Sequence, residues 1–408
     1  MRTVMRLFYL LIVACMCSIL LTCHPDRLPG SFYPAVAFDE LNRRYLAVFV
    51  KVSGGQSRIS GVFIDSDGGP LGGEFVVAAA GGQFFCPSLV YDNIHSKFLV
   101  VWNAETSIYA QSINTDGTPN GPRLSLSDTA EPPSGRCSAL AFDHVQGAFL
   151  AAWGEKNPSD HDSLYARLIT ADGSLAGPKV LISNDGATPA WPSVAYDSAN
   201  QRYLAVWDNA GNHEIKGSII RPDGSVDTPE FSIHSVGGVE YRPKAVYDSF
   251  NARFMVTWEH SDTPAGKFAL LGQMWNADGT SNQPVFTISA AGLDVLRHAA
   301  VFDPVRKQYL ILFGDFNQDI QRIHSQIVLA DGASGTVAVN NDVLLSDADY
   351  AGDRRPAVAY DSVNQRYFSA WSYGSGDQQF SDIHGRHVNS DGTPSGQIYV
   401  LSNGGIWP

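Results

Sequence analysis

A motif that recurs seven times in one register constrains this chain more than any other feature. Its clearest copy reads Pro192-Ser-Val-Ala-Tyr196-Asp197, and after a polar turn it continues as Tyr203-Leu-Ala-Val-Trp207. The aspartates of the seven copies are Asp39, Asp92, Asp143, Asp197, Asp248, Asp303 and Asp361. They are 53, 51, 54, 51, 55 and 58 residues apart. A period of this length indicates a repeat architecture in which each unit is one supersecondary structure.

Three aromatic positions keep a fixed distance from the aspartate in every copy. The residue before it is Phe38, Tyr91, Phe142, Tyr196, Tyr247, Phe302 or Tyr360. The sixth residue after it is Tyr45, Phe98, Phe149, Tyr203, Phe254, Tyr309 or Tyr367. The tenth is Phe49, Trp102, Trp153, Trp207, Trp258, Phe313 or Trp371. Because every unit carries them, we predict that the aspartate and these aromatic residues are structural.

Each repeat contains four candidate strands. The first is short and consists mainly of small residues, as in Pro356-Ala-Val-Ala-Tyr360. The second is rich in β-branched and aromatic residues. The third leads into an Asp-Gly pair, a strong hairpin signal, and a fourth strand follows. These pairs begin at Asp67, Asp116, Asp172, Asp223, Asp278, Asp331 and Asp391.

The second strand of each repeat is apolar on both faces, since Tyr203 and Ala205 alternate with Leu204 and Val206. A sheet that is covered on both sides has this pattern. Seven four-stranded sheets that pack face to face form a β-propeller, so we predict an all-β, seven-bladed β-propeller of antiparallel blades over residues 32–404. The expected blades span about 32–80, 85–130, 136–186, 190–236, 240–291, 296–348 and 354–404. The ring starts with an inner strand and ends with an outer one, so we expect blade 7 to close on blade 1 by side-chain packing alone.

The first 23 residues have the features of a targeting segment. Arg2 and Arg6 precede an apolar run of about sixteen residues, which is shorter than the ~20 that span a bilayer. We interpret residues 1–23 as a signal peptide, 24–31 as a tether and 405–408 as a tail. Leu20-Leu21-Thr22-Cys23 resembles a bacterial lipoprotein box, in which Cys23 would be lipidated, although Thr22 replaces the usual small residue. Plain secretion and an uncleaved anchor are the alternatives.

Two cysteines, Cys86 and Cys137, lie outside this segment, each six residues before its aspartate in neighbouring repeats. Equivalent positions on adjacent inner strands could satisfy the roughly 4.4–6.8 Å that a disulfide requires between Cα atoms. A secreted protein permits such a bond, and two buried thiols are the alternative.

The repeat resembles bacterial secreted β-propeller repeats of the form Pro-x-Val-Ala-Tyr-Asp, Tyr-Leu-x-Val-Trp and Asp-Gly, over nearly the whole mature chain. This resemblance implies a fold and an extracytoplasmic, periplasmic or cell-surface location. It differs from the sialidase Asp-box, which has a fixed glycine and a shorter spacing from aspartate to tryptophan, and from WD repeats. No catalytic residue is therefore transferred from either family.

Functional residues are expected where the repeats differ, on the rim around the channel mouth. The sixth residue before the aspartate is Tyr33, Cys86, Cys137, Trp191, Arg242, Arg297 or Arg355. The three arginines with Trp191 and Tyr241 suggest a binding site for an acidic or hydroxylated ligand such as a glycan, because guanidinium groups pair with carboxylates and aromatic faces stack on sugars. Alternatively, these arginines only neutralise neighbouring carboxylates.

A carbohydrate-active enzyme is the second hypothesis. Glycoside hydrolysis needs two carboxylates, for which the rim offers Glu155, Asp208 and Glu259, and a polysaccharide lyase could use His260 or His298. We find no serine-hydrolase, phosphate-loop or redox motif outside the leader. A role that depends only on protein partners is the third hypothesis.

The net charge of −13 argues against nucleic-acid binding. We expect partners to be proteins or glycans at the cell surface, and membrane contact only through the N-terminal anchor. No resident cofactor is predicted. Calcium binding is kept as an alternative, because Asp315, Asn317 and Asp319 place oxygen ligands at alternate positions. The glycine and the distal glutamate of a full calcium-binding loop are missing.

Overall fold

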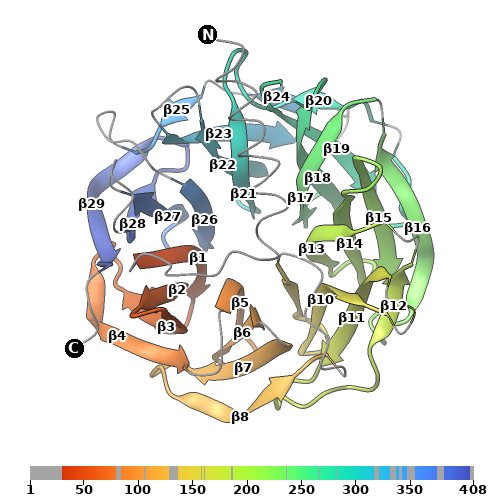
Figure 1. Ribbon diagram of the computed structural model, residues 1–408. Coiled ribbons are helices and arrows are strands. Elements are labelled where there is room, and N and C mark those ends of the chain that lie inside the picture. The colour runs from red at the N-terminus through yellow and green to blue at the C-terminus, as the bar shows by residue number, and fades with distance from the viewer. Residues whose placement is uncertain are drawn as a thin grey trace.

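The structure is a computed structural model. It describes residues 30–79, 84–104, 107–127, 137–157, 159, 161–184, 187–235, 237–264, 266–281, 283–316, 321–330, 337–339, 342–346, 354–374 and 381–404. These residues form seven antiparallel sheets arranged in a ring (Figure 1). The all-β, seven-bladed β-propeller predicted from the repeat is therefore confirmed. No helix in the described residues is long and apolar enough to cross a membrane.

Within each blade the strands follow chain order from the inside of the ring to its outer edge. The first four blades comprise β1 (Gly30–Asp39), β2 (Arg44–Ser53), β3 (Gln56–Ile64) and β4 (Pro70–Ala78); β5 (Phe84–Asp92), β6 (Lys97–Ala104), β7 (Ile108–Asn114) and β8 (Pro119–Ser125); β9 (Ala139–Asp143), β10 (Ala148–Lys156), β11 (Asp162–Ile169) and β12 (Val180–Ser183); and β13 (Pro189–Asp197), β14 (Arg202–Asn209), β15 (Glu214–Ile220) and β16 (Val226–His234).

The remaining three blades comprise β17 (Val239–Asp248), β18 (Arg253–Ser261), β19 (Ala269–Asn276) and β20 (Phe286–Thr287); β21 (Val295–Asp303), β22 (Gln308–Asp315), β23 (Arg322–Ala330), β24 (Val337–Val339) and β25 (Val343–Leu344); and β26 (Arg354–Asp361), β27 (Arg366–Gly374), β28 (Ser381–Val388) and β29 (Pro394–Ser402). In blade 6 both β24 and β25 pair with β23. Strand β1 starts at Gly30, two residues before the expected start of blade 1, because Gly30 and Ser31 pair with Val52 and Lys51.

The repeated aspartate organises the turn from the first to the second strand of each blade. All seven are completely buried. In Asp197, for example, Oδ1 accepts the backbone N–H groups of Ala199 and Asn200 at 2.9 and 3.0 Å. Four residues after each aspartate the backbone is left-handed, at Arg43, Ser96, Gly147, Gln201, Ala252, Lys307 and Gln365. The aspartate thus satisfies turn donors that would otherwise be buried without acceptors.

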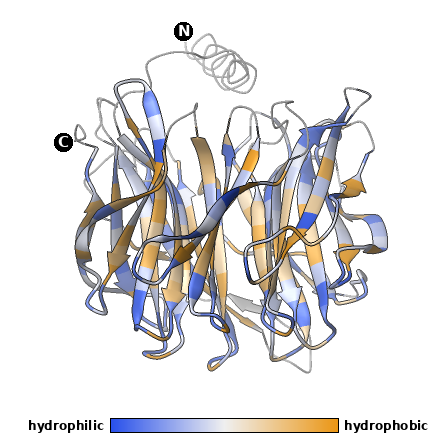
Figure 2. Cartoon of the chain, turned by 90° about the horizontal axis from the view of Figure 1, so that it is seen from below, coloured by the Kyte–Doolittle hydropathy of each residue, from blue (hydrophilic) through white to orange (hydrophobic). Residues whose placement is uncertain are grey.

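The hydrophobic core lies between the blades. The buried apolar residues form seven clusters, and each joins two neighbouring blades. The large aromatic at the tenth position is completely buried in every blade, as in Trp207 and Phe313. Figure 2 shows the resulting distribution, with hydrophobic residues along the strands and hydrophilic residues at the turns. This confirms that the repeated aromatic residues are structural.

Among the described strands, blade 7 closes on blade 1 without sharing a strand with it. The hydroxyl of Tyr45 in β2 donates to Asp361 Oδ2 across this seam at 3.1 Å. The hydroxyls of Ser31 and Ser402 lie 2.8 Å apart, and an apolar cluster that includes Phe38 and Phe368 fills the space between the two blades. Side chains therefore hold the ring closed.

Candidate functional site

The channel mouth is formed by the residues six positions before each repeated aspartate. In six blades this residue is left-handed although it is not glycine: Tyr33, Cys86, Trp191, Arg242, Arg297 and Arg355, with φ between 44° and 61°. The pairing register between the first two strands shifts at the same place in these blades. A left-handed non-glycine residue costs about 1 kcal/mol, so six copies of this β-bulge are a systematic feature that redirects the side chain.

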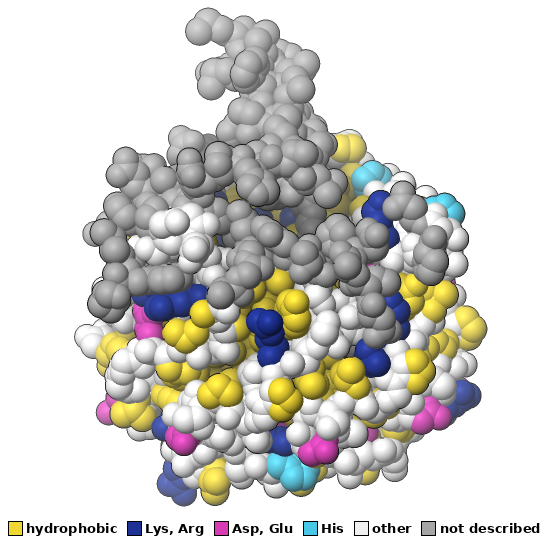
Figure 3. Space-filling view, turned by 60° about the horizontal axis from the view of Figure 1, so that its bottom comes forward, with side chains coloured by type: hydrophobic (Ala, Val, Ile, Leu, Met, Phe, Trp, Pro, Cys, Tyr) yellow, Lys and Arg dark blue, Asp and Glu magenta, His cyan; other side chains and the backbone are white. Residues whose placement is uncertain are grey.

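A cavity of about 150 Å³ occupies the mouth. All seven residues at this position line it, together with their neighbours: Tyr33, Pro34, Cys86, Pro87, Ser88, Cys137, Ser138, Trp191, Pro192, Arg242, Lys244, Arg297, His298, Arg355 and Pro356. Among these described lining residues, four are Arg or Lys and none is Asp or Glu. On the part of the surface that Figure 3 shows, Lys and Arg side chains are interspersed with Asp, Glu and hydrophobic side chains. The described lining of the cavity is thus cationic in a chain of net charge −13.

Aromatic rings accompany two of the arginines. The guanidinium carbon of Arg355 lies 3.5 Å from the centre of the Tyr33 ring. That of Arg242 lies 5.2 Å from the Trp191 ring and 5.7 Å from the Tyr241 ring. Of the five predicted binding residues, Arg242, Arg297, Arg355 and Trp191 line the cavity, whereas Tyr241 lies beside Arg242 outside it. These contacts fix the direction of long side chains and so reduce the entropy they would lose on binding.

Two carboxylates are buried behind the arginines. Asp208 and Glu259 occupy the eleventh position after the aspartate in blades 4 and 5, and neither is exposed. Asp208 Oδ2 accepts the backbone N–H of Arg242 at 2.9 Å, and Glu259 Oε1 accepts that of Arg297 at 2.5 Å. Glu259 Oε2 also forms a 2.5 Å ion pair with Arg242 Nη1. Each carboxylate therefore supports the bulge of the following blade.

The charges around Glu259 are tightly coupled. Although burial opposes its ionisation, Arg242 and His298 hold the pKa of Glu259 below its usual range. Burial likewise opposes the charge of Arg242, yet Glu259 raises the pKa of the guanidinium. Burial lowers the pKa of Lys244 and that of His298. His298 is therefore neutral at pH 7, with Nε2 at 2.9 Å from Thr257 Oγ1 and Nδ1 at 3.6 Å from Glu259 Oε1.

Other candidates from the sequence lie elsewhere. Glu155, at the twelfth position after its aspartate, forms an ion pair with Lys179 and accepts the Trp153 Nε1–H at 2.7 Å, so it is not part of the mouth. His260, also at the twelfth position, contacts Glu240. Asp315 Oδ1 accepts the backbone N–H of Asp294 at 3.0 Å. Asn317, Asp319 and Cys23 lie outside the described residues.

Cys86 and Cys137 are joined by a disulfide, with Cα atoms 5.3 Å apart. The bond links β5 of blade 2 to the residues that directly precede β9 of blade 3, at the cavity wall. It adds a covalent tie between two blades that otherwise contact each other through side chains.

Three lining residues that matter for charge or shape, Tyr33, Lys244 and His298, were not in the predicted binding set, although Tyr33 was placed at the mouth and His298 was named as a lyase candidate. Two of them carried a signal in the repeat. Lys244 occupies a position, four before the aspartate, where the other blades have only Ala or Ser. His298 occupies a position, five before it, where five of the other six blades have Pro. Both departures could have marked the mouth of blades 5 and 6.

No protein family model matches the chain, and no curated protein matches it in sequence. Several solved structures are similar in fold. The β-propeller domain of the Trilobed protease from Pyrococcus furiosus, described as having an open velcro topology, has a TM-score of 0.52 and 7% identity, over 92% of this chain and 98% of that one. NanB sialidase from Streptococcus pneumoniae has a TM-score of 0.51 and 10% identity, over 88% and 67%. A leech intramolecular trans-sialidase has a TM-score of 0.52 and 8% identity, over 89% and 68%. At these identities the similarity shows the propeller fold alone.

Proposed function

We propose that this propeller is a binding scaffold whose channel mouth holds an acidic ligand, with a carboxylate-bearing glycan as the leading class. The observation that carries the proposal is the composition of the cavity wall, where Arg242, Lys244, Arg297 and Arg355 converge and no described lining residue is acidic. Guanidinium groups bind carboxylates through paired hydrogen bonds, and Trp191 and Tyr33 offer aromatic faces for the apolar face of a sugar ring.

The positions of the carboxylates favour binding over hydrolysis. A glycoside hydrolase needs two carboxyl groups roughly 5–9 Å apart that reach the substrate. Asp208 and Glu259 are completely buried and accept backbone N–H groups of the arginine bulges, so their oxygens serve the protein. Both ring nitrogens of His298 likewise face protein groups, Thr257 and Glu259, which disfavours this histidine as the base of a lyase.

We also propose that the protein works outside the cytoplasm. Residues 1–23 have the charge and length pattern of a signal peptide, and a disulfide links Cys86 with Cys137. Structural disulfides persist mainly in oxidising compartments. Secretion or anchoring through Cys23 would place the ring where extracellular or envelope glycans are present.

The test is binding of uronate-containing, sialylated and neutral glycans, measured by calorimetry at low and at physiological salt, with the glycan recovered afterwards to check its length. We expect acidic glycans to bind, more weakly at higher salt, and to be recovered intact. Neutral glycans should not bind. Shortened acidic glycan would instead establish the enzyme hypothesis. If no glycan binds at either salt concentration, the acidic-glycan proposal is wrong, and a role through protein partners becomes the leading hypothesis.

Arg297→Ala and Arg355→Ala are the informative variants, because Arg242 also supports Glu259 and its loss would disturb the fold. Charged hydrogen bonds contribute about 1.5–3 kcal/mol each, so each substitution should weaken binding about 10- to 150-fold. Arg43→Gln is the matched control, since Arg43 is exposed at the turn on the opposite face of the ring. Equal affinities for all three variants and the wild type would place the ligand elsewhere.

A further inference from the structure

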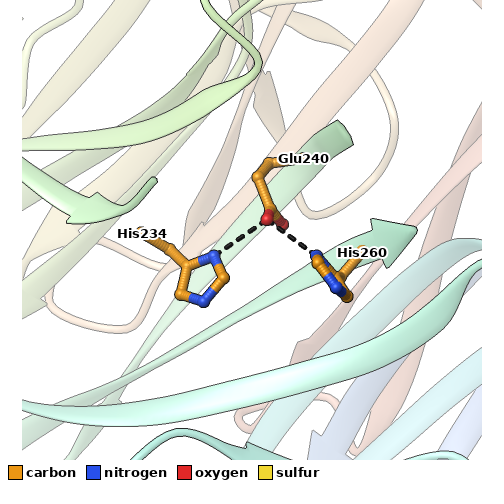
Figure 4. A group of neighbouring side chains, drawn as sticks. All are labelled: His234, Glu240 and His260. Carbon is orange, nitrogen blue, oxygen red and sulfur yellow. Dashed lines mark hydrogen bonds and ion pairs between the residues drawn. The ribbon is translucent and has the colours of Figure 1, made fainter. Parts of the chain in front are cut away.

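A second group of polar side chains lies at the interface between blades 4 and 5. His234 ends β16, the outermost strand of blade 4, while Glu240 and His260 lie on β17 and β18 of blade 5 (Figure 4). His234 Nδ1 and His260 Nδ1 lie 2.8 and 2.7 Å from the same oxygen, Glu240 Oε1. One ligand atom from each of the three residues lies within 4.8 Å of the other two. Nothing in the proposed glycan site uses these groups.

The surroundings of the cluster are more enclosed than a solvated surface. The Glu240 side chain is completely buried, and its second oxygen, Oε2, has no hydrogen-bond partner among the described residues. The His234 side chain is 9% exposed, and its ring centre lies 4.9 Å from that of Trp258. A buried carboxylate oxygen without a donor is costly, so this site calls for a further positive group.

The second nitrogen of His260 indicates what that group could be. His260 Nε2 lies 3.2 Å from Oδ1 of the exposed Asp262. If Nε2 carries the proton and donates it to Asp262, then Nδ1 points a lone pair at Glu240 Oε1. Two lone pairs at 2.7 Å repel each other unless a cation lies between them. A carboxylate that orients a histidine from its far nitrogen is the usual outer partner in metal sites.

We propose that His234, Glu240 and His260 bind one divalent transition-metal ion, and that zinc is the ion this ligand set suits best. Two imidazoles and one carboxylate form a recurrent three-residue zinc set with a fourth position left for solvent. Tetrahedral zinc with bonds near 2.05 Å separates its ligand atoms by about 3.3 Å. The observed 2.7 and 2.8 Å contacts would have to widen by roughly half an ångström, which side-chain rotation supplies. Imidazole ligands disfavour calcium and magnesium.

The metal would connect the end of β16 with the two strands that carry the channel mouth. Glu240 precedes Arg242 by two residues, and His260 directly follows Glu259. An ion bound here therefore ties blade 4 to blade 5 beside the cationic cavity. Because binding energy at a site that exists only in the folded chain adds to folding stability, zinc should raise the unfolding midpoint.

The test uses the purified protein after removal of metal with a chelator. Calorimetric titration with zinc chloride should give one ion per chain with a Kd below about 1 μM. Cobalt, bound in its place, should show the visible absorption of a tetrahedral ion. Zinc should raise the thermal midpoint and chelator should reverse the effect, whereas calcium should do neither.

Variants separate a metal site from a plain hydrogen-bond cluster. His234→Ala, His260→Ala and Glu240→Gln should each weaken zinc binding at least about tenfold, and Asp262→Asn by a smaller factor. His161→Ala, a change at an exposed histidine in blade 3, is the control and should bind zinc like the wild type. Absence of stoichiometric zinc binding by the wild type would overturn the proposal even if a variant fails to fold. Equal binding by the control and the three ligand variants would do so as well.

Discussion

Replacing Glu259 by glutamine tests how the channel mouth is held together. The carboxylate serves two donors at once, the backbone N–H of Arg297 through Oε1 and the Arg242 guanidinium through Oε2. Glutamine keeps the shape but has only one acceptor oxygen, and its amide N–H groups would face either the Arg297 N–H or the guanidinium. The substitution therefore leaves one buried donor unsatisfied and the Arg242 charge without its counter-ion.

The expected cost follows from the burial of this pair. Removing one partner of a buried ion pair costs about 3–5 kcal/mol, because the other charge stays in a poorly solvated place. We expect Glu259→Gln to lower the free energy of unfolding by this amount at pH 7. Adding Arg242→Met to Glu259→Gln should recover part of the loss, with a coupling energy of at least about 1 kcal/mol, since the two side chains are in direct contact.

The pH dependence gives an independent readout. The pKa of Glu259 lies below its ordinary value of 4.5 in the folded protein, so its ionised form contributes stability at neutral pH. This contribution is complete above the pKa that Glu259 has in the unfolded chain, and it is lost as the pH falls through the pKa that Glu259 has in the folded protein. The difference between wild type and Glu259→Gln, measured by urea unfolding from pH 7 down to about pH 3, should therefore shrink below pH 4.5.

Two results would refute this account of Glu259. One is a Glu259→Gln protein as stable as the wild type at pH 7, which would mean that the carboxylate does not hold the bulges of Arg242 and Arg297. The other is strict additivity of the two substitutions in the double variant. Glu155→Gln is an informative comparison, because Glu155 is equally buried but pairs with Lys179 away from the mouth, so it should not alter ligand binding.

Three further predictions concern the ring itself. The disulfide closes a loop with a sequence separation of 51 residues. The double variant Cys86→Ser, Cys137→Ser should therefore have a free energy of unfolding about 4 kcal/mol lower than the wild type. A reductant should lower the free energy of unfolding of the wild type but not that of the double variant. Trp207→Ala should cost about 3–5 kcal/mol in urea unfolding, since the side chain is completely buried between blades 3 and 4; a loss under 1 kcal/mol would contradict this. Tyr45→Phe removes one hydrogen bond across the seam and should lower the free energy of unfolding by about 1 kcal/mol. It should also increase amide exchange in β1 and β26 more than in β13, and a uniform increase would contradict a local weakening of the seam.

Much of the channel mouth was accessible from the sequence because the repeat assigns equivalent positions. Counting six residues back from each aspartate gave Trp191, Arg242, Arg297 and Arg355, which line one cavity. The same counting shows that the three carboxylates proposed for catalysis do not occupy equivalent positions in their repeats. Asp208 and Glu259 stand eleven residues after their aspartates and Glu155 stands twelve after, and on a strand such neighbours point to opposite faces. The prediction that all three carboxylates lie on one rim did not take this difference in position into account.

The remaining site features depend on contacts between blades, which no local pattern contains. The distance from Glu259 to the Arg297 N–H is set by how blade 5 packs on blade 6, and the meeting of His234 with Glu240 and His260 is set by how blade 4 packs on blade 5. The left-handed bulges were also not predictable, because Tyr, Trp and Arg have no preference for that conformation.

The sequence by itself determined the ring of seven blades, because turns, strand alternation and aromatic spacing are local properties that repeat with the chain. The tertiary structure alone decided which way each irregular residue faces. A one-residue β-bulge points the arginine side chains into the mouth. Glu259 and His260 are neighbours on β18 and point to opposite faces of the sheet, so Glu259 lies at the interface with blade 6 and His260 at the interface with blade 4. Chemistry at these sites depends on distances of a few ångströms between elements, and such distances exist only after the blades have packed.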